Sequence, residues 1–362
     1  MAEIKYEIVK NDLKAIIESG KYQPGDKLPT ESDLMDKYQV SRYTIRRAVG
    51  ELQNAHYIYR IQGGGMYVDD WQRNKNKPVI NNKMIGVVTT HLADYIFPSI
   101  ISGIDRTISA QGYSMIVSNT HNNRQKEQQS LQQMLDNQVA GLIIEPTQSA
   151  LPEPNIELYK KIEEAKIPTL FINAHYSQIQ APHLEVDDIV AEEKVVNYLI
   201  EQGHQRILGI FQVDDMQGTK RLRGFMNAYM QHPEISYMAQ TVMYQSDQDM
   251  TKIFQRVSEI MDHKERPTAI VCYNDELAIQ IVDVIRAMGL QVPENVSIVG
   301  FDDYVLGRFI DPSLSTIAHP KEKMGIDAGN MIMRLINGEK VESIEYTLPI
   351  KLRDSVQSLK GE

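Results

Sequence analysis

Residues 24–68 read PGDKLPTESDLMDKYQVSRYTIRRAVGELQNAHYIYRIQGGGMYV, and this stretch decides the fold of the amino-terminal part of the chain. Thr30 and Asp33 have the spacing of a variant capping box, which predicts the start of a short helix that ends near Tyr38. Ser41 is placed to cap a second helix. The apolar residues of that second helix recur at helical spacing and predict its buried face: Ile45, Ala48, Val49 and Leu52.

The segments on either side complete a small domain. Ile4–Ser19 has helical spacing, and Gly20 stands where a helix commonly ends. After the second helix, Tyr57–Gln62 and Met66–Asp69 are typical of two short strands joined by glycines. A helix, a helix-turn-helix and a β-hairpin in this order predict a winged helix-turn-helix, which is an α+β fold.

Charge is divided unevenly along the chain, although the total for the 362 residues is −10. Residues 1–83 carry 14 Lys and Arg against 11 Asp and Glu, whereas the remainder carries 24 against 37. At the beginning of the second helix, Arg42, Tyr43, Arg46 and Arg47 are expected to point outward. Because attraction to phosphate acts within about 10 Å, this local basic stripe favours DNA binding in spite of the acidic total.

A polar stretch, DDWQRNKNKPVINNK, follows the small domain. We therefore expect a DNA-binding domain at residues 1–70, a linker at 71–83 and a second domain at 84–362. The second domain alternates apolar runs with amphipathic segments, and its length favours a two-lobed α/β architecture with parallel sheets. A ligand cleft is expected at the carboxyl ends of the strands. Eight strands are predicted, at residues 84–90, 114–118, 141–144, 169–172, 207–211, 241–244, 269–272 and 297–300.

The stretch quoted above resembles the DNA-binding domain of the gluconate-operon-repressor (GntR) family over nearly its full length. This resemblance implies that the beginning of the second helix lies against DNA, through Ser41, Arg42, Tyr43, Thr44 and Arg46. It also implies contacts at the start of the preceding helix, at the wing tip and at the amino end of the chain, through Glu31 and Ser32, Gln62 and Gly63, and Lys5.

The second domain resembles a different family, the lactose/galactose repressor (LacI/GalR) class, whose sensor domains share the periplasmic sugar-binding fold. The stretches IGVVTT, GLIIEPT, KRLRGF, CYNDELAI and PENVSIVGFDDY carry this resemblance over most of residues 84–350. It implies a small-molecule effector bound by Arg221, Asn274 and Asp302. Further candidates lie at a strand end or in the loop after the first strand, where they would supply polar and stacking contacts: Glu145, Asp94, Tyr95 and Phe97.

Some residues of the second domain have plain structural alternatives. Asn274 or Asp275 would cap a helix, and Asp275 is expected to be the cap. Asp303 is expected to be a turn residue, and His319 is expected to be a satisfied histidine at the surface.

A winged domain of one family joined to a sensor domain of the other is an unusual fusion, and it resembles the arabinose-responsive repressors. His91–Ile104 and Glu145–Ile156 carry this closer resemblance. It implies a homodimeric repressor of arabinose or pentose utilisation genes that binds double-stranded operator DNA, is released by L-arabinose and needs no cofactor. Two alternatives stay open. The effector would be a sugar phosphate or a purine, which Lys220, Arg221 and Arg223 permit, or the protein would be a cytoplasmic sugar sensor that acts through a protein partner.

Other classes of protein are disfavoured by what the sequence lacks. It contains no phosphate-binding loop, no nucleophile elbow and no pair of histidines at metal-ligand spacing, so we expect neither an enzyme nor a metal site. The single cysteine, Cys272, excludes a disulfide framework. No apolar run is long enough for a membrane span or a secretory signal, and we expect a cytoplasmic protein without a membrane partner.

Overall fold

The structure, a computed structural model, describes residues 5–54, 57–61, 64–69, 83–92 and 95–360. The chain divides into two compact units, Met1–Asn81 and Asn82–Glu362. The division falls within the linker expected at residues 71–83, of which residues 71–82 lie outside the described ones. Among the described residues, no helix has the length and apolar character needed to cross a lipid bilayer.

The small unit is a winged helix-turn-helix, as the sequence predicts. Thr30 and Asp33 form a capping box in which each side chain accepts from the other residue's backbone N–H. Ser41 caps the following helix, because its hydroxyl accepts from the backbone N–H of Thr44 at 3.3 Å. The elements are α1 (Lys5–Glu18), α2 (Glu31–Tyr38), α3 (Arg42–Asn54) and an antiparallel hairpin of β1 (Ile58–Ile61) and β2 (Gly65–Val68). Their core includes Leu13, Ile17, Leu34, Ile45, Val49, Leu52, Ile58 and Val68.

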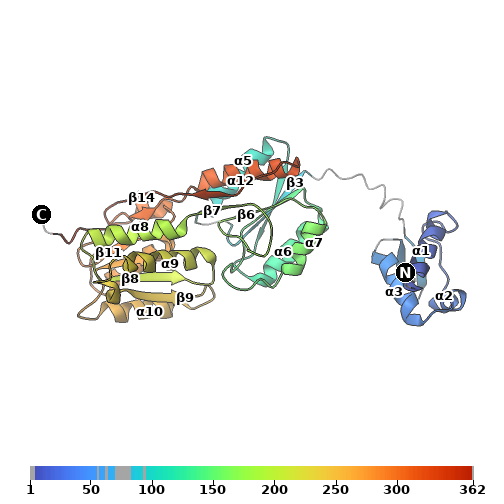
Figure 1. Ribbon diagram of the computed structural model, residues 1–362, viewed down its shortest axis with the longest axis horizontal. Helices are drawn as coiled ribbons and strands as arrows, with labels where there is room; N and C mark the ends of the chain where they lie inside the picture. Colours follow the sequence, from blue (N-terminus) through green and yellow to red (C-terminus); the bar gives the residue numbers. More distant parts are fainter. Residues whose placement is uncertain (1–4, 55–56, 62–63, 70–82, 93–94, 361–362) are drawn as a thin grey trace. The chain divides into compact units, whose positions relative to one another are not determined.

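The amino-terminal lobe of the large unit, in which Figure 1 labels β3, β6 and β7, contains a parallel sheet with the strand order β13-β7-β6-β5-β3-β4. These strands are β3 (Met84–Thr89), β4 (Ser114–Asn119), β5 (Gly141–Ile144), β6 (Thr169–Ile172), β7 (His183–Val186) and β13 (Ile344–Tyr346). The helices of this lobe are α5 (Phe97–Ser109), α6 (Arg124–Asp136), α7 (Ile156–Glu164) and α12 (Lys321–Ile336). Gly325 permits close packing of α12 on α5, because a Cβ there would lie 2.1 Å from the carbonyl oxygen of Ile100.

The second lobe contains a parallel sheet with the order β11-β10-β8-β9. Its strands are β8 (Ile207–Gln212), β9 (Gln240–Tyr244), β10 (Ala269–Cys272) and β11 (Ser297–Val299). Its helices are α8 (Asp188–Glu201), α9 (Met216–Met230), α10 (Met250–Met261) and α11 (Asp275–Ala287), with short 3-10 turns η1 (Ser236–Met238) and η2 (Val305–Arg308). A two-stranded ribbon of β12 (Thr316–Ile317) and β14 (Ile350–Lys351) adjoins β11.

The chain passes between the lobes after β7, before α12 and after β13. Because the two sheets are joined only by such short crossovers, the residues near them sit where the lobes would hinge. The eight predicted strands are confirmed to within one residue at each end. The sequence prediction missed β7, β12, β13 and β14, which are only two to four residues long and, in β7 and β13, contain a glutamate.

Candidate functional site

The first candidate site is the outward face of α3. The side chains of Arg42 and Arg46 are 67% and 61% exposed, and Tyr43 is 76% exposed. This confirms that they point away from the core. Ser41 and Thr44 stand at the beginning of the helix, where their hydroxyl oxygens lie 2.9 Å apart. Arginines and a tyrosine at the start of the second helix of a helix-turn-helix are placed to reach phosphates and base edges.

Glu31, the first residue of α2, gathers the arginines of this face. Its carboxylate lies 3.1 Å from Nε of Arg46, 3.1 Å from Nη2 of Arg60 and 3.6 Å from Nε of Arg42. Exposed ion pairs of this kind are each worth about 1 kcal/mol or less. Without DNA, Glu31 therefore orients the arginines but binds each of them weakly enough for a phosphate to replace it. Ser32 follows Glu31 in the first turn of α2.

Two further basic residues, neither predicted from the sequence, lie at the Glu31 carboxylate and at the hairpin. Arg60 comes from β1 and shares the Glu31 carboxylate. Lys27 lies against the wing, since a Cβ on Gly65 would be 3.0 Å from Cε of Lys27. Lys27 lies in the segment before α2, and its backbone pairs with that of Tyr67, which brings Lys27 to the hairpin. Its position just after the predicted turn was the only feature of the sequence that could have indicated this contact. Three predicted contacts lie outside what the structure describes: Gln62, Gly63 and the side chain of Lys5.

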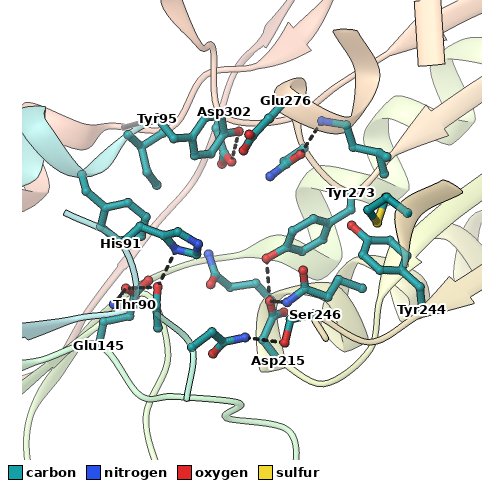
Figure 2. Close-up of a pocket in the computed structure, with 18 of the residues that line it drawn as sticks. Thr90, His91, Tyr95, Glu145, Asp215, Tyr244, Ser246, Tyr273, Glu276 and Asp302 are labelled. Atoms are coloured by element: carbon teal, nitrogen blue, oxygen red, sulfur yellow. Dashed lines mark hydrogen bonds between the residues drawn. The ribbon is translucent and has the colours of Figure 1, made fainter. Parts of the chain in front are cut away.

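The second candidate site is a cavity of about 250 Å³ between the two lobes of the large unit. It lies at the carboxyl ends of strands, as predicted: Thr90 follows β3, Glu145 follows β5, Tyr244 ends β9 and Tyr273 follows β10. Figure 2 shows these side chains, from both lobes, around one space. A ligand bound there would contact both lobes at once.

The cavity is rich in acceptors and poor in cations. Four carboxylates are among its lining residues, whereas none of its lining residues is a lysine or an arginine. Aromatic rings form part of the wall. This combination suits the hydroxyl groups and the apolar C–H face of a sugar. The carboxylates are Glu145, Asp215, Glu276 and Asp302, and the rings are Tyr95, Phe97, Tyr244 and Tyr273.

Hydrogen bonds from Thr90 and Asn173 fix the orientation of the Glu145 carboxylate. Its Oε2 accepts from the backbone N–H of Thr90 at 2.9 Å and from the Thr90 hydroxyl at 2.6 Å. Its Oε1 accepts from Nδ2 of Asn173 at 2.9 Å. Burial raises the pKa of Glu145, although these hydrogen bonds oppose that shift. The sequence placed Glu145 at a strand end, and the structure places it in the cavity wall.

Asp215 and Tyr273 form a part of the wall that the sequence analysis did not assign. The Tyr273 hydroxyl donates to Oδ2 of Asp215 at 2.5 Å, and the backbone N–H of Gly218 donates to Oδ1 at 2.6 Å. Burial raises the pKa of Asp215 to about 6. Tyr244 lies in the same wall. Both tyrosines could have been found from the sequence, because Tyr244 ends one predicted strand and Tyr273 directly follows another.

Asp302 is a buried wall residue, 3% exposed, and Arg221 lies behind it. Arg221 is 1% exposed, donates from Nε to Asp188 at 2.9 Å, and places its guanidinium 3.5 Å from the ring centre of Phe301. Nη2 of Arg221 and Oδ1 of Asp302 are 3.6 Å apart, and both atoms are buried without a hydrogen-bond partner among the described residues. The predicted pair is therefore brought together, with Asp302 in the wall and Arg221 not among the lining residues.

Asn274 also lines the cavity, and it caps the helix α11, a role that the sequence analysis expected for Asp275. Its side-chain oxygen accepts from the backbone N–H of Leu277 at 2.9 Å, so Asn274 caps α11. The prediction that Asp275 is the cap is wrong. Asp275 is buried and accepts from the Thr316 hydroxyl at 2.7 Å and the Tyr304 N–H at 2.6 Å. Burial raises the pKa of Asp275 to about 8.

Two further sequence interpretations are corrected. Asp303 is more than a turn residue, because its carboxylate pairs with Arg308, Lys351 and Arg353 at 2.5 to 2.8 Å. His319 is not at the surface: it is 5% exposed, and within the described part of the chain neither ring nitrogen has a hydrogen-bond partner. Burial lowers the pKa of His319 to about 4. It follows the two-residue strand β12, at a crossover between the lobes, and so becomes enclosed.

The structure places only some of the remaining predicted ligand-binding residues in the cavity wall. Tyr95 and Phe97 line the cavity, while Asp94 lies outside the described residues. Lys220, considered for an anionic effector, is not a lining residue and pairs with Glu185 at 2.5 Å.

Two family models match separate parts of the chain, and two relatives match nearly all of it. A model described as "Bacterial regulatory proteins, gntR family" matches residues 5–68, and one described as "Periplasmic binding protein-like domain" matches residues 196–356. The "Arabinose metabolism transcriptional repressor" of Geobacillus stearothermophilus is 40% identical over 360 residues, 98% of each chain. The protein of the same name from Halalkalibacterium halodurans is 39% identical over 370 residues, covering 99% of this chain and 98% of that one. The chain belongs to their family of transcriptional repressors.

A solved structure supports the fold of the large unit. A periplasmic binding protein/LacI transcriptional regulator from Alkaliphilus metalliredigens matches with a TM-score of 0.64 at 21% identity, over 76% of this chain and 99% of that chain. Membership of the repressor family, together with the winged domain and the sugar-binding type of sensor fold, makes the protein a sugar-responsive, DNA-binding repressor rather than an enzyme.

Proposed function

We propose that the repressor binds its operator through α3 and the wing, and that L-arabinose bound in the cleft between the lobes releases the DNA. The observation that carries the choice of effector is the cavity itself. It presents four carboxylates and no lysine or arginine among its lining residues. A phosphorylated sugar would need cations there to offset its two negative charges. A neutral polyol needs acceptors, which the cavity supplies, and the names of the two full-length relatives favour arabinose.

Glu145, Asn274 and Asp302 are the side chains from which we expect hydrogen bonds to the sugar hydroxyls. Arg221 would complete the site from behind, because its unpartnered Nη2 faces Oδ1 of Asp302 across 3.6 Å. A hydroxyl that donates to Asp302 and accepts from Arg221 would satisfy two buried groups that are costly to leave unpaired. The rings of Tyr95 and Phe97 would pack on the C–H face.

On the operator, Arg42 and Arg46 would read bases while Ser41, Tyr43, Thr44 and Arg60 position the helix on the phosphates. Sugar would favour one arrangement of the lobes, and that arrangement would hold the DNA-binding domains less suitably. An effector shifts such an equilibrium only by its differential affinity, so a coupling of about 1–3 kcal/mol would weaken operator binding 5- to 150-fold.

We also propose that the repressor acts as a homodimer. The second lobe exposes several large apolar side chains, among them Met230 at 74%, Tyr237 at 78% and Phe309 at 79%. Exposed apolar groups of this kind are common where protein surfaces associate. Light scattering should give the mass of a dimer for the wild type and of a monomer for Phe309→Asp. A dimeric mass for both would mean that Phe309 lies outside the interface, and a monomeric wild type would contradict the dimer.

Calorimetric titration tests the effector. L-arabinose should give saturable heat, whereas L-arabinose 5-phosphate and hypoxanthine should give none at the same concentrations. Heat from the phosphate alone would instead favour the sugar-phosphate alternative, and heat from hypoxanthine alone would favour the purine. Either result would overturn the choice of a neutral sugar.

A further inference from the structure

The side chain of Tyr95 crosses the cleft between the lobes. Tyr95 belongs to the amino-terminal lobe, just before α5, and its hydroxyl lies 2.5 Å from Oδ2 of Asp302 in the second lobe. The same hydroxyl lies 2.9 Å from the carbonyl oxygen of Phe301 and accepts from the backbone N–H of Asp275 at 3.3 Å. Figure 2 shows Tyr95 and Asp302 side by side at one edge of the cavity. Three groups of the second lobe thus surround one hydroxyl of the first.

This hydroxyl stands where a ligand hydroxyl would be expected. Asp302 is the wall carboxylate to which we assign a sugar hydroxyl, and the Tyr95 hydroxyl already donates to its Oδ2. The other oxygen, Oδ1, is buried and has no hydrogen-bond partner in the part of the chain that the structure describes. A phenol and a sugar hydroxyl are similar donors to a carboxylate, so a sugar hydroxyl directed at Oδ2 would compete with the Tyr95 phenol for that atom.

The backbone at both ends of this contact is in an unusual conformation. Tyr95 has φ +61°, and Asp302 has φ +97°, both in the left-handed region that residues with a side chain rarely adopt. Bulky residues persist in this region only where surrounding contacts hold them, and such positions cluster at ligand clamps and switches. The ring of Tyr304, 5.0 Å from that of Tyr95, is one neighbour that holds it.

We propose that Tyr95 is an internal competitor of the effector. In the sugar-free repressor, its hydroxyl takes the place of a sugar hydroxyl on Asp302 and latches the lobes together. The effector must displace this hydroxyl to bind. This inference rests on the proposed function of the cleft. It makes the Tyr95 hydroxyl a determinant of how much sugar is needed for a response. The ring of Tyr95 remains a wall of the site, whereas its hydroxyl acts against the ligand.

The test compares Tyr95→Phe with Tyr304→Phe in the full-length chain. Both changes remove one phenolic oxygen from adjacent rings, but only the first removes the contact with Asp302. Titration calorimetry with L-arabinose should give a Kd about tenfold lower for Tyr95→Phe than for the wild type, because a charge-assisted hydrogen bond no longer has to be broken. Tyr304→Phe should leave the Kd within twofold. A Kd that rises for Tyr95→Phe would make the hydroxyl a ligand contact and overturn the proposal, as would an unchanged Kd.

A second measurement needs no sugar. Hydrogen exchange of peptides covering residues 95–104 and 297–318 should be faster in Tyr95→Phe than in Tyr304→Phe, because the latch between the lobes is lost. Equal exchange in the two variants would contradict the latch. If the wild type gives no heat with L-arabinose, the proposed effector fails, and the exchange measurement then decides by itself whether Tyr95 holds the lobes.

Discussion

On α3, Arg42 and Arg46 are largely exposed and share a single carboxylate, that of Glu31. In the cleft, Asp302 is 3% exposed and faces an arginine that is itself 1% exposed. The first arrangement leaves cations available to a polyanion, since exposed ion pairs are weak and exchange readily. The second leaves buried acceptors and donors partly unpaired, which favours a neutral ligand able to satisfy them. The same residue types thus serve opposite ligands according to their burial.

The largest effect is expected where the exposed cations are removed. Arg42→Ala combined with Arg46→Ala should raise the Kd for operator DNA at least about 30-fold, because each base contact of an arginine is worth about 1–3 kcal/mol. Calorimetry should find sugar binding unchanged in the same protein. Fluorescence anisotropy at fixed salt measures the DNA affinity.

Arg256→Ala is the control for the double variant, because Arg256 is an exposed arginine of α10 that pairs only with Glu259 among the interactions described. It should bind DNA as the wild type does. Equal DNA affinity in the double variant and the wild type would contradict the assignment of the α3 face. It would favour instead a sugar sensor that acts through a protein partner.

Protonation of the buried His319 is expected to lower the stability of the fold. The folded pKa of His319 is about 4, below the value near 6.5 of an unfolded histidine. The neutral ring therefore stabilises the fold fully above pH 6.5, and this contribution of about 3 kcal/mol is lost as the pH falls toward 4. His319→Gln should lose less stability than the wild type over that interval in chemical unfolding followed by circular dichroism. Parallel losses in the two proteins would show that His319 is protonated without penalty.

A smaller effect is expected when one oriented acceptor of the cleft is changed. Glu145→Gln should weaken L-arabinose binding about 10- to 100-fold, because a hydrogen bond to a charged group is worth about 1.5–3 kcal/mol. Operator affinity without sugar should stay within twofold. Glu157→Gln, a change at an exposed residue of α7, is the control and should alter neither property. A sugar affinity unchanged in Glu145→Gln would remove Glu145 from the site.

Patterns that depend on neighbouring residues were predictable from the sequence, and those that depend on distant ones were not. Buried strands such as β5 and β10 are continuous apolar runs, so their limits were found to within a residue. β7 contains Glu185, which Lys220 of the other lobe neutralises, and no local pattern reports such a partner. For the same reason the sequence could not place His319 in the interior.

The candidate sites divide in the same way. Helix-turn-helix contacts follow from spacing along one segment, and the exposed positions of Arg42 and Arg46 were foreseen. The cleft draws on the ends of several strands from two lobes. Glu145 was found from its position after a strand, while Asp215 and Tyr273 were missed because their pairing spans 58 residues. Whether Asn274 or Asp275 caps α11 depends on the backbone turn at that point, which residue type alone does not determine.

Fluorescence anisotropy on the upstream DNA of its own gene, with and without millimolar L-arabinose, tests the central claim most directly. The repressor should bind this DNA tightly at fixed salt, and L-arabinose should raise the Kd by at least fivefold while D-glucose leaves it unchanged. Binding that L-arabinose does not alter would contradict the proposed effector. Absence of binding to any upstream fragment would contradict the account of the protein as a sugar-released repressor.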